Sequence, residues 1–322
     1  MKNELKYFII FFIIGPVSMY GQIYNYLSSD DFELNNPSYV GLKDYSHISI
    51  SSKQSFDLKN KSSNSSSLYG SYFFEDLDFF IGYSLNSMSF SEFGASQYNA
   101  SLSYVYKLNL NNDSFIYPYI SGNIYMPNKF SDLIFEDNLF SGLPSIDPLL
   151  ETQNKSYVDL NAGLMFKSEN LLMGLSLNNL LKAKLTDEDS NDPIRLKRTL
   201  DLNIGYQNNI IRNTLGLAFI GSYFYRPSLY SQFNFSEIRL DQIVMLDNGF
   251  EIGGFQEIYS NSFSKKMKAI GFNAKFKFGS LEIGVNYRSS KSKEILNTEN
   301  YMGATFRFKF NAIQNENYLL KW

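Results

Sequence analysis

Apolar and polar residues alternate along most of this chain, and this period of two constrains its fold more than any other feature. Near residue 200, Leu202 and Ile204 fall on one side of an extended backbone, while Asp201 and Asn203 fall on the other. The same pattern returns in 281–287. Such alternation indicates a β-strand whose two faces meet different surroundings. Segments with helical spacing and caps are hard to find, so the sequence predicts an all-β protein.

The predicted strands are long, and their length bears on the class of β protein. About fourteen candidates lie near 46–56, 66–75, 78–90, 95–108, 114–125, 156–168, 170–178, 197–208, 212–225, 232–246, 249–259, 267–278, 280–290 and 299–310. Strands of soluble proteins are commonly ~5–6 residues long, whereas a tilted strand that crosses a bilayer needs ~9–11. We therefore expect a transmembrane antiparallel β-barrel of about 14 strands over residues 46–310.

The connections between these strands alternate in length. Every second junction is a tight turn, while the others are mostly longer, for example 57–65, 126–155 and 179–196. Outer-membrane barrels have short periplasmic turns and long extracellular loops. Junction 91–94 departs from the pattern because it is short although it belongs to the set of long connections. The alternation predicts a barrel with long extracellular loops in the cell outer membrane, surrounded by its lipid.

Outward residues of such a barrel must be apolar, because lipid offers polar groups no hydrogen bonds, whereas the interior is polar. We expect the carboxylates that face inward to be neutralised by cations that also face inward. The carboxylates are Asp159, Asp201, Glu237, Asp241, Glu251 and Glu257, and the cations are Arg239, Lys275, Lys277, Arg307 and Lys309.

Tyrosine is abundant near the predicted strand ends. The residues concerned are Tyr45, Tyr83, Tyr104, Tyr106, Tyr117, Tyr119, Tyr223, Tyr225 and Tyr287. Tyrosine favours the boundary between membrane and water, which predicts an aromatic girdle. It also suits β structure in general, and both interpretations stay open.

The first 21 residues have the parts of a secretory signal peptide. Lys2 and Lys6 precede the short apolar run 7–17, which is too short to span a bilayer. We expect cleavage after Gly21; an uncleaved anchor is the alternative. The expected organisation is then a signal peptide (1–21), an N-terminal periplasmic segment that enters the barrel (22–45), the barrel (46–310) and a C-terminal periplasmic tail (311–322).

Composition excludes several kinds of chemistry. The chain has no Cys and one His, so it has neither a thiol nucleophile nor a site with two histidine ligands. A formal net charge of −3 without a basic stripe argues against nucleic acid. His47 is the one imidazole base, and no Gly-x-Ser-x-Gly elbow accompanies it. The oxygen-rich acidic run 187–192 could bind calcium, but it lacks EF-hand spacing, so we expect a solvated loop. We predict no enzyme, no metal and no cofactor.

Segment 126–155 is unusual because it is apolar although it lies in a predicted loop. A loop that water merely solvates would not carry so many apolar groups. We expect it either to close the lumen or to bind a partner. The residues predicted to bind a partner are Phe130, Ile134, Phe135, Leu139, Phe140 and Leu143.

Three stretches resemble a known family. Residues 35–41 read Asn-Asn-Pro-Ser-Tyr-Val-Gly and are similar to the Asn-Pro-Ala-Tyr-Ala-Gly signature that opens the PorP/SprF proteins. Residues 102–108 resemble the fourth-strand pattern of that family, and 159–164 with 174–181 resemble its central hairpin. The resemblance runs from Gln22 to Phe310. It gives Asn36, Pro37, Tyr39 and Gly41 a structural role in the segment that enters the first strand.

The resemblance implies an outer-membrane barrel of Bacteroidota-type bacteria that belongs to the type IX secretion system and the associated gliding machinery. Such proteins help to deliver or anchor large secreted adhesins. The implied partners are a secreted adhesin or its C-terminal domain, together with periplasmic or lipoprotein components of the secretion system. Two alternatives stay open: a transport barrel for a small solute, and a hydrolase that uses Ser and His47.

Overall fold

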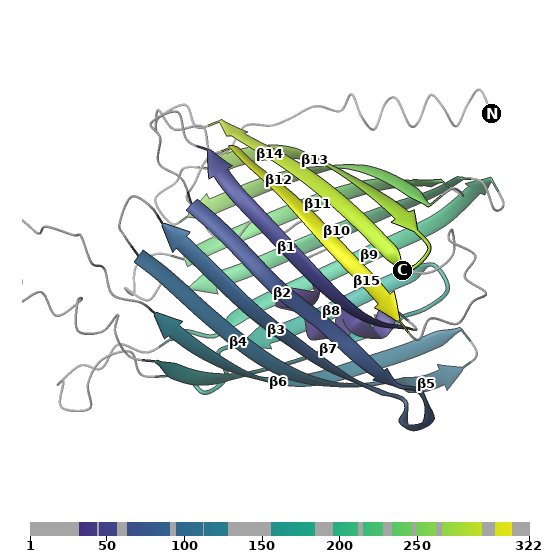
Figure 1. Ribbon diagram of the computed structural model, residues 1–322, viewed down its shortest axis with the longest axis horizontal. Helices are drawn as coiled ribbons and strands as arrows, with labels where there is room; N and C mark the ends of the chain where they lie inside the picture. The colour runs from purple at the N-terminus through teal and green to yellow at the C-terminus, as the bar shows by residue number, and fades with distance from the viewer. Residues whose placement is uncertain are drawn as a thin grey trace, which may run out of the picture.

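The computed structural model describes residues 32–43, 45–56, 63–90, 95–111, 113–127, 156–183, 196–211, 215–227, 234–246, 249–261, 266–291 and 300–310. Its strands are β1 (Ser46–Phe56), β2 (Ser63–Phe74), β3 (Phe79–Phe90), β4 (Ala95–Tyr106), β5 (Leu108–Asn111), β6 (Ser114–Pro127), β7 (Tyr157–Lys167), β8 (Leu171–Asn178), β9 (Thr199–Ile211), β10 (Leu215–Pro227), β11 (Asn234–Leu246), β12 (Phe250–Asn261), β13 (Lys266–Phe278), β14 (Leu281–Lys291) and β15 (Asn300–Phe310). Figure 1 shows them as a tilted ring.

The sheet closes on itself. β1 pairs antiparallel with β15 from Ser46 opposite Phe310 to Phe56 opposite Asn300. β4 and the short β5 both pair with β6, and Lys107 between them is the point at which one strand is interrupted. The fifteen labelled strands therefore make a closed antiparallel barrel of 14 strands, as the sequence predicts. Closure removes the unpaired edges that an open sheet would present.

The two faces of the barrel reverse the arrangement of a soluble protein. Along β15, Thr305, Arg307 and Lys309 are buried, whereas Phe306 and Phe308 are about half exposed. Along β9, Leu202, Ile204 and Tyr206 are exposed in the same way, and Asp201 and Asn203 are buried. A polar interior and an apolar exterior are typical of a barrel whose outer face meets lipid. The alternation that predicted the strands therefore also predicted which face points outward.

The aromatic girdle is only partly present. Tyr104, Tyr106 and Tyr287 point outward as predicted. The prediction is wrong for three other tyrosines, which are buried inside the barrel: Tyr45, Tyr117 and Tyr119. Their rings pack within the interior because a segment from the N-terminal side occupies it.

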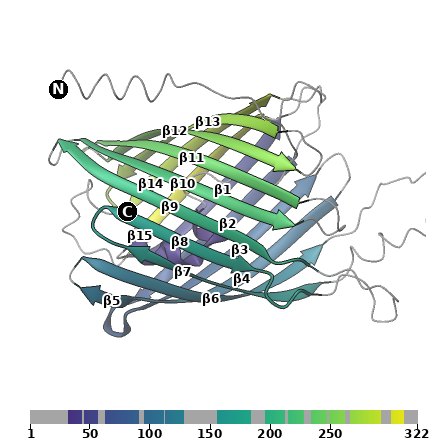
Figure 2. The ribbon, with the colours of Figure 1, turned by 180° about the vertical axis from the view of Figure 1, so that it is seen from behind.

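That segment contains α2 (Phe32–Asn35) and the 3₁₀ helix η2 (Pro37–Leu42). Figures 1 and 2, from opposite sides, both show it within the ring of strands. We call residues 32–43 the luminal segment. Residues 22–45 are predicted to form a periplasmic segment that enters the barrel, and the described part, the luminal segment, packs inside the lumen. Among the described residues, no helix is long and apolar enough to cross a membrane.

Tight turns gather at one end of the barrel and long connections at the other. The 3₁₀ helix η3 (Glu75–Leu77) joins β2 to β3, and Gly279 turns between β13 and β14 with a positive φ of 56°, which glycine adopts without strain. β1 begins and β15 ends at this short-turn end. The longest connection, between Pro127 and Tyr157, is at the opposite, long-loop end.

Candidate functional site

The luminal segment owes its compact shape to the sequence Asn-Pro at its centre. The side chain of Asn36 accepts a hydrogen bond from the backbone N–H of Ser38 at 3.1 Å, which caps η2. Pro37 occupies the first helical position, where its fixed φ suits the helix and its missing N–H costs nothing. The chain therefore turns sharply inside the barrel and then leads into β1.

One side of the luminal segment packs against β6. Ser38 Oγ donates to the carbonyl oxygen of Tyr117 at 2.7 Å. A Cβ on Gly41 would lie 2.2 Å from Cδ1 of the Tyr117 ring, so no larger residue fits there without movement. Tyr39 stacks on Phe32 with ring centroids 5.2 Å apart. Burial, and then the charge of Asp241, raise the pKa of the Tyr39 phenol above its ordinary value.

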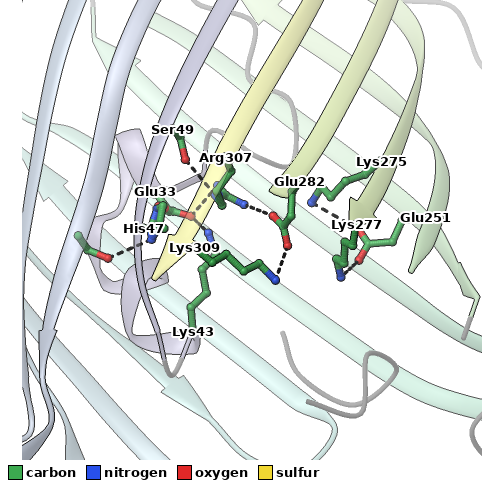
Figure 3. Close-up of polar contacts among 11 residues, drawn as sticks. Glu33, Lys43, His47, Ser49, Glu251, Lys275, Lys277, Glu282, Arg307 and Lys309 are labelled. Atoms are coloured by element: carbon green, nitrogen blue, oxygen red, sulfur yellow. Dashed lines mark hydrogen bonds and ion pairs between the residues drawn. The ribbon is translucent and has the colours of Figure 1, made fainter. Parts of the chain in front are cut away.

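The opposite side of the segment is held by charge. Glu33 is 8% exposed, and its carboxylate meets three basic groups. Arg307 Nη2 donates to Glu33 Oε1 at 3.1 Å, His47 Nε2 lies 2.8 Å from Oε2, and Lys43 forms an ion pair with the same carboxylate. Figure 3 shows Glu33 between His47 on β1 and Arg307 on β15. The luminal segment is thus fixed at the seam where the barrel closes.

From this seam a layer of alternating charge extends across β14, β13 and β12 (Figure 3). Arg307 and Lys309 bond the two oxygens of Glu282 at 3.0 and 2.8 Å. Lys275 lies 3.4 Å from Glu251, which Lys277 also contacts. We define the charged layer as Glu33, Glu251, Lys275, Lys277, Glu282, Arg307 and Lys309. Every carboxylate in it has a cation, which is what a buried charge requires.

A second buried set, the arginine cluster, consists of Arg239, Asp241, Glu257 and Arg288. Arg239 donates to both oxygens of Asp241 at 2.8 and 2.6 Å and to Glu257 at 3.2 Å. Arg288 Nε bonds the other oxygen of Glu257 at 2.6 Å. The guanidinium of Arg239 also lies 4.0 Å from the ring centre of Phe255 and 5.8 Å from that of Phe32. It therefore connects the barrel wall to the luminal segment.

The structure confirms much of the predicted luminal pairing. Asp241, Glu251 and Glu257 have the ionic partners expected of them. Asp159 behaves differently, because its carboxylate accepts backbone N–H groups of Leu160, Leu181 and Ala183 and so fixes the chain that follows β8.

Sequence reasoning missed Glu33, Glu282 and Arg288 as members of these networks. The period of two places Glu282 and Arg288 on an inward face, so that signal could have found them. Glu33 lies outside any alternating segment, and nothing in the sequence indicates its partners.

The side chains of Ser71, His47 and Glu33 lie in a row at hydrogen-bonding distances. Ser71 Oγ lies 3.2 Å from His47 Nδ1, and the carboxylate of Glu33 contacts His47 Nε2. A nucleophile, base and carboxylate in this order could activate a hydroxyl in an open site. Here Ser71 and His47 are both 0% exposed, and neither lines a cavity described in this structure. With Ser71 and His47 fully buried among the described residues, this geometry gives no support to the hydrolase alternative.

The long-loop half of the lumen contains a cavity of ≈ 410 Å³, which we call the polar chamber. Serine and asparagine side chains make up most of its lining, and the larger share of them comes from β2, β3, β4, β6 and β7. Leu34 and Asn35 of the luminal segment form part of its wall. Beside the charged layer and the arginine cluster, the lumen therefore contains a largely uncharged, hydrogen-bonding cavity.

The predicted partner-binding residues of 126–155 and the acidic run 187–192 lie outside the described residues. Within the described residues, no group of three or more His, Asp or Glu side chains could hold a metal ion. Of the motif residues, Asn36, Tyr39 and Gly41 are buried within the luminal segment, and Pro37 begins η2.

Comparison with known proteins gives a family and a fold. The family model described as "Type IX secretion system membrane protein PorP/SprF" matches residues 22–309. Among curated proteins, none matches this chain in sequence.

Several solved structures superpose on the barrel. CymD, a monoaromatic hydrocarbon channel, has a TM-score of 0.60 at 9% identity over 90% of this chain and 95% of its own. The Pseudomonas putida toluene transporter TodX has a TM-score of 0.55 at 10% identity, and the match covers 91% of this chain and 96% of TodX. A Pseudomonas aeruginosa FadL homologue has a TM-score of 0.53 at 8% identity, and the match covers 91% of this chain and 96% of the homologue. Such identities show the fold alone. With the family match, they place the protein in the outer membrane.

Proposed function

This chain belongs to the PorP/SprF family of type IX secretion system membrane proteins, and we propose that it is a non-enzymatic outer-membrane barrel that binds a secreted surface protein and helps to deliver or anchor it. The expected partner is a large adhesin or its C-terminal domain. Periplasmic or lipoprotein components of the secretion and gliding machinery are the further partners.

The luminal segment is the observation that carries this proposal. It reaches β6 through Ser38 and the β1–β15 seam through Glu33, so it extends between separate parts of the barrel wall. A barrel whose interior holds its own packed chain is poorly suited to pass a folded protein through the lumen. This arrangement supports a role in binding cargo at a surface of the barrel.

The long-loop end is the surface we assign to the cargo. β6 ends at Pro127 and β7 begins at Tyr157, so both ends of the longest connection are anchored there. Its sequence carries Phe130, Ile134, Phe135, Leu139, Phe140 and Leu143. Apolar residues on an exposed surface commonly mark a protein contact. The tail 311–322 at the short-turn end is the candidate contact for a periplasmic partner.

A complementation experiment tests this proposal. In a strain that lacks the chain, wild-type protein should restore the surface adhesin, measured by labelling of intact cells, whereas a variant without 130–150 should not. The matched control replaces 57–62, another connection of the long-loop end, by Gly and Ser and should restore display. Chemical crosslinking followed by mass spectrometry should join 130–150 to the adhesin. Full display by the 130–150 deletion would refute the assignment of the loop, and normal display without the chain would refute the function.

A transport barrel for a small solute is the second candidate. The polar chamber favours it, since it opens a volume in the long-loop half of the lumen. CymD and TodX are named as a hydrocarbon channel and a toluene transporter, although the hydrogen-bonding lining of this chamber suits a polar solute better than an apolar one. Recording in planar bilayers distinguishes the two functions: a stable open conductance that changes when 126–155 is altered supports transport.

A further inference from the structure

The polar chamber differs in chemistry from the charged layer and the arginine cluster. Lys53 and Asp201 are the only charged residues among the described side chains that line it. The short-turn half, in contrast, contains the charged layer. Ser and Thr hydroxyls and Asn and Gln amides each offer both donors and acceptors without net charge. The chamber therefore suits a ligand that is itself uncharged and rich in groups that both donate and accept.

Several amide atoms of residues that line the chamber have no hydrogen-bond partner among the described residues, although Nδ2 of one of them, Asn86, donates to Ser84 and Asn99. Asn123, on β6, is 5% exposed, and its Nδ2 is unpartnered. Oδ1 of Asn86 and Nδ2 of Asn35 are unpartnered too, and all three residues line the chamber. Buried polar atoms in folded proteins are nearly always satisfied. These three atoms, on residues that line one cavity, are groups that a polar ligand in the cavity would satisfy.

Two aromatic residues lie beside these amides. Tyr125 on β6 and Tyr157 on β7 stack with ring centroids 4.8 Å apart and planes 20° apart, and both line the chamber. A tyrosine offers an apolar ring together with a polar hydroxyl. The wall thus combines hydrogen-bonding groups with a flat apolar surface.

We propose that the polar chamber binds a neutral saccharide, an uncharged oligosaccharide segment whose hydroxyls meet the Ser and Asn side chains and whose apolar C–H face lies against the tyrosine pair. The volume of ≈ 410 Å³ falls within the range of ~300–1,000 Å³ found for small-molecule sites. The amides of Asn123, Asn86 and Asn35 hold the ligand from three elements, namely β6, β3 and α2.

Other ligand classes fit less well. An anion or a cation would require an excess of one sign, whereas Lys53 and Asp201 carry opposite charges. An apolar solute would leave the amides unsatisfied. An extended peptide is commonly recognised by pairing with a free strand edge, and the described β4–β6 and β1–β15 pairings close the sheet. This inference goes beyond the proposed function, which needs no saccharide.

Calorimetry on the full chain in lipid nanodiscs tests the proposal. The probes are three neutral trisaccharides, namely maltotriose, cellotriose and triacetylchitotriose, with toluene as an apolar probe and trigalacturonate as a charged one. We expect at least one neutral trisaccharide to bind saturably. Asn123→Leu should weaken that binding by about tenfold, the effect of one lost hydrogen bond to a polar group.

Asn203→Leu is the matched control. Asn203 is a buried luminal residue whose amide Oδ1 is unpartnered, but it does not line the chamber. Its replacement should therefore leave the dissociation constant of the saccharide within about twofold of the wild-type value. Asn99→Ala changes a less buried lining residue and tests the site even where Asn123→Leu disturbs folding.

Three results would overturn the proposal. The first is that no neutral trisaccharide binds. The second is that toluene or trigalacturonate binds more tightly than every neutral trisaccharide. The third is saccharide binding that neither Asn123→Leu nor Asn99→Ala weakens. Adhesin display is measured separately, so loss of this inference leaves the proposed function standing.

Discussion

Arg307, on the last strand of the barrel, donates through Nη2 to Glu33 of the luminal segment at 3.1 Å. The two residues are 274 positions apart in sequence. Arg307 also bonds Glu282 through Nη1 and Ser49 through Nε, so one guanidinium joins β14, β1 and the luminal segment. The position of the luminal segment therefore depends on closure of the barrel, because one of its ionic partners, Arg307, lies on the last strand.

Removal of the charge on Glu33 should loosen the luminal segment. Glu33→Gln removes the carboxylate that Lys43 pairs with and one of the two carboxylates that Arg307 bonds, and breaking a buried pair costs about 3–5 kcal/mol. Because the chain has no Cys, a Val40→Cys variant carries a single label site at a position that is 3% exposed. The rate of maleimide labelling at residue 40 should rise at least about tenfold in the Glu33→Gln background.

Glu75→Gln, which changes an exposed carboxylate of η3, is the control and should leave the labelling rate unchanged. Equal rates in all three backgrounds would mean that Glu33 does not hold the segment in place.

A side chain at position 41 should displace the segment from β6. Gly41→Ala places its Cβ 2.2 Å from Cδ1 of Tyr117, so either the ring or the segment must shift. We expect destabilisation of about 1–3 kcal/mol, typical of overpacking, measured as a lower urea midpoint in detergent. Gly122→Ala is the matched control on the same strand as Tyr117, since its nearest neighbour, Leu160 Cδ2, is 4.0 Å away. Equal midpoints for the two variants would contradict this packing.

The arginine cluster should tolerate the loss of a pair better than the loss of one member. Arg239→Met leaves the Asp241 carboxylate buried without the two bonds that Arg239 donates to it. Its unfolding free energy should fall by about 3–5 kcal/mol. Adding Asp241→Leu removes the unpaired charge and should recover part of that loss, as a double-mutant cycle in urea would measure. If the double variant is less stable than Arg239→Met, Asp241 has a favourable role apart from this pair.

Asp159 should control the stretch that follows β8. Its carboxylate accepts the N–H of Leu181 at 2.9 Å and that of Ala183 at 3.3 Å. Asp159→Ala removes both bonds, each worth about 1 kcal/mol, so amide exchange at 181 and 183 should accelerate roughly fivefold or more by hydrogen–deuterium exchange. Asp113→Ala, at an exposed residue of a short turn, should leave these amides unchanged. Unaltered exchange in Asp159→Ala would show that other contacts fix this stretch.

The orientation of individual side chains was predictable where alternation is regular. Successive residues of a strand point to opposite faces. A period of two therefore places Asp201 and Arg307 inside the barrel, and it places Ile204 and Phe306 outside. The tyrosines show where this reasoning fails. Tyr117 and Tyr119 suit a girdle by composition, yet both are buried against the luminal segment or its neighbours.

The class of fold, the approximate borders of the strands and the polarity of each face could be predicted from the amino-acid sequence, because they depend on local periodicity and on the length needed to cross a bilayer. The folded barrel was needed to show that residues 32–43 lie inside it, that Glu33 meets Arg307, and that amide groups with unpartnered atoms from three elements line one chamber. Such contacts join residues tens to hundreds of positions apart. Closure of the sheet sets their distances, and no local pattern in the chain encodes that closure.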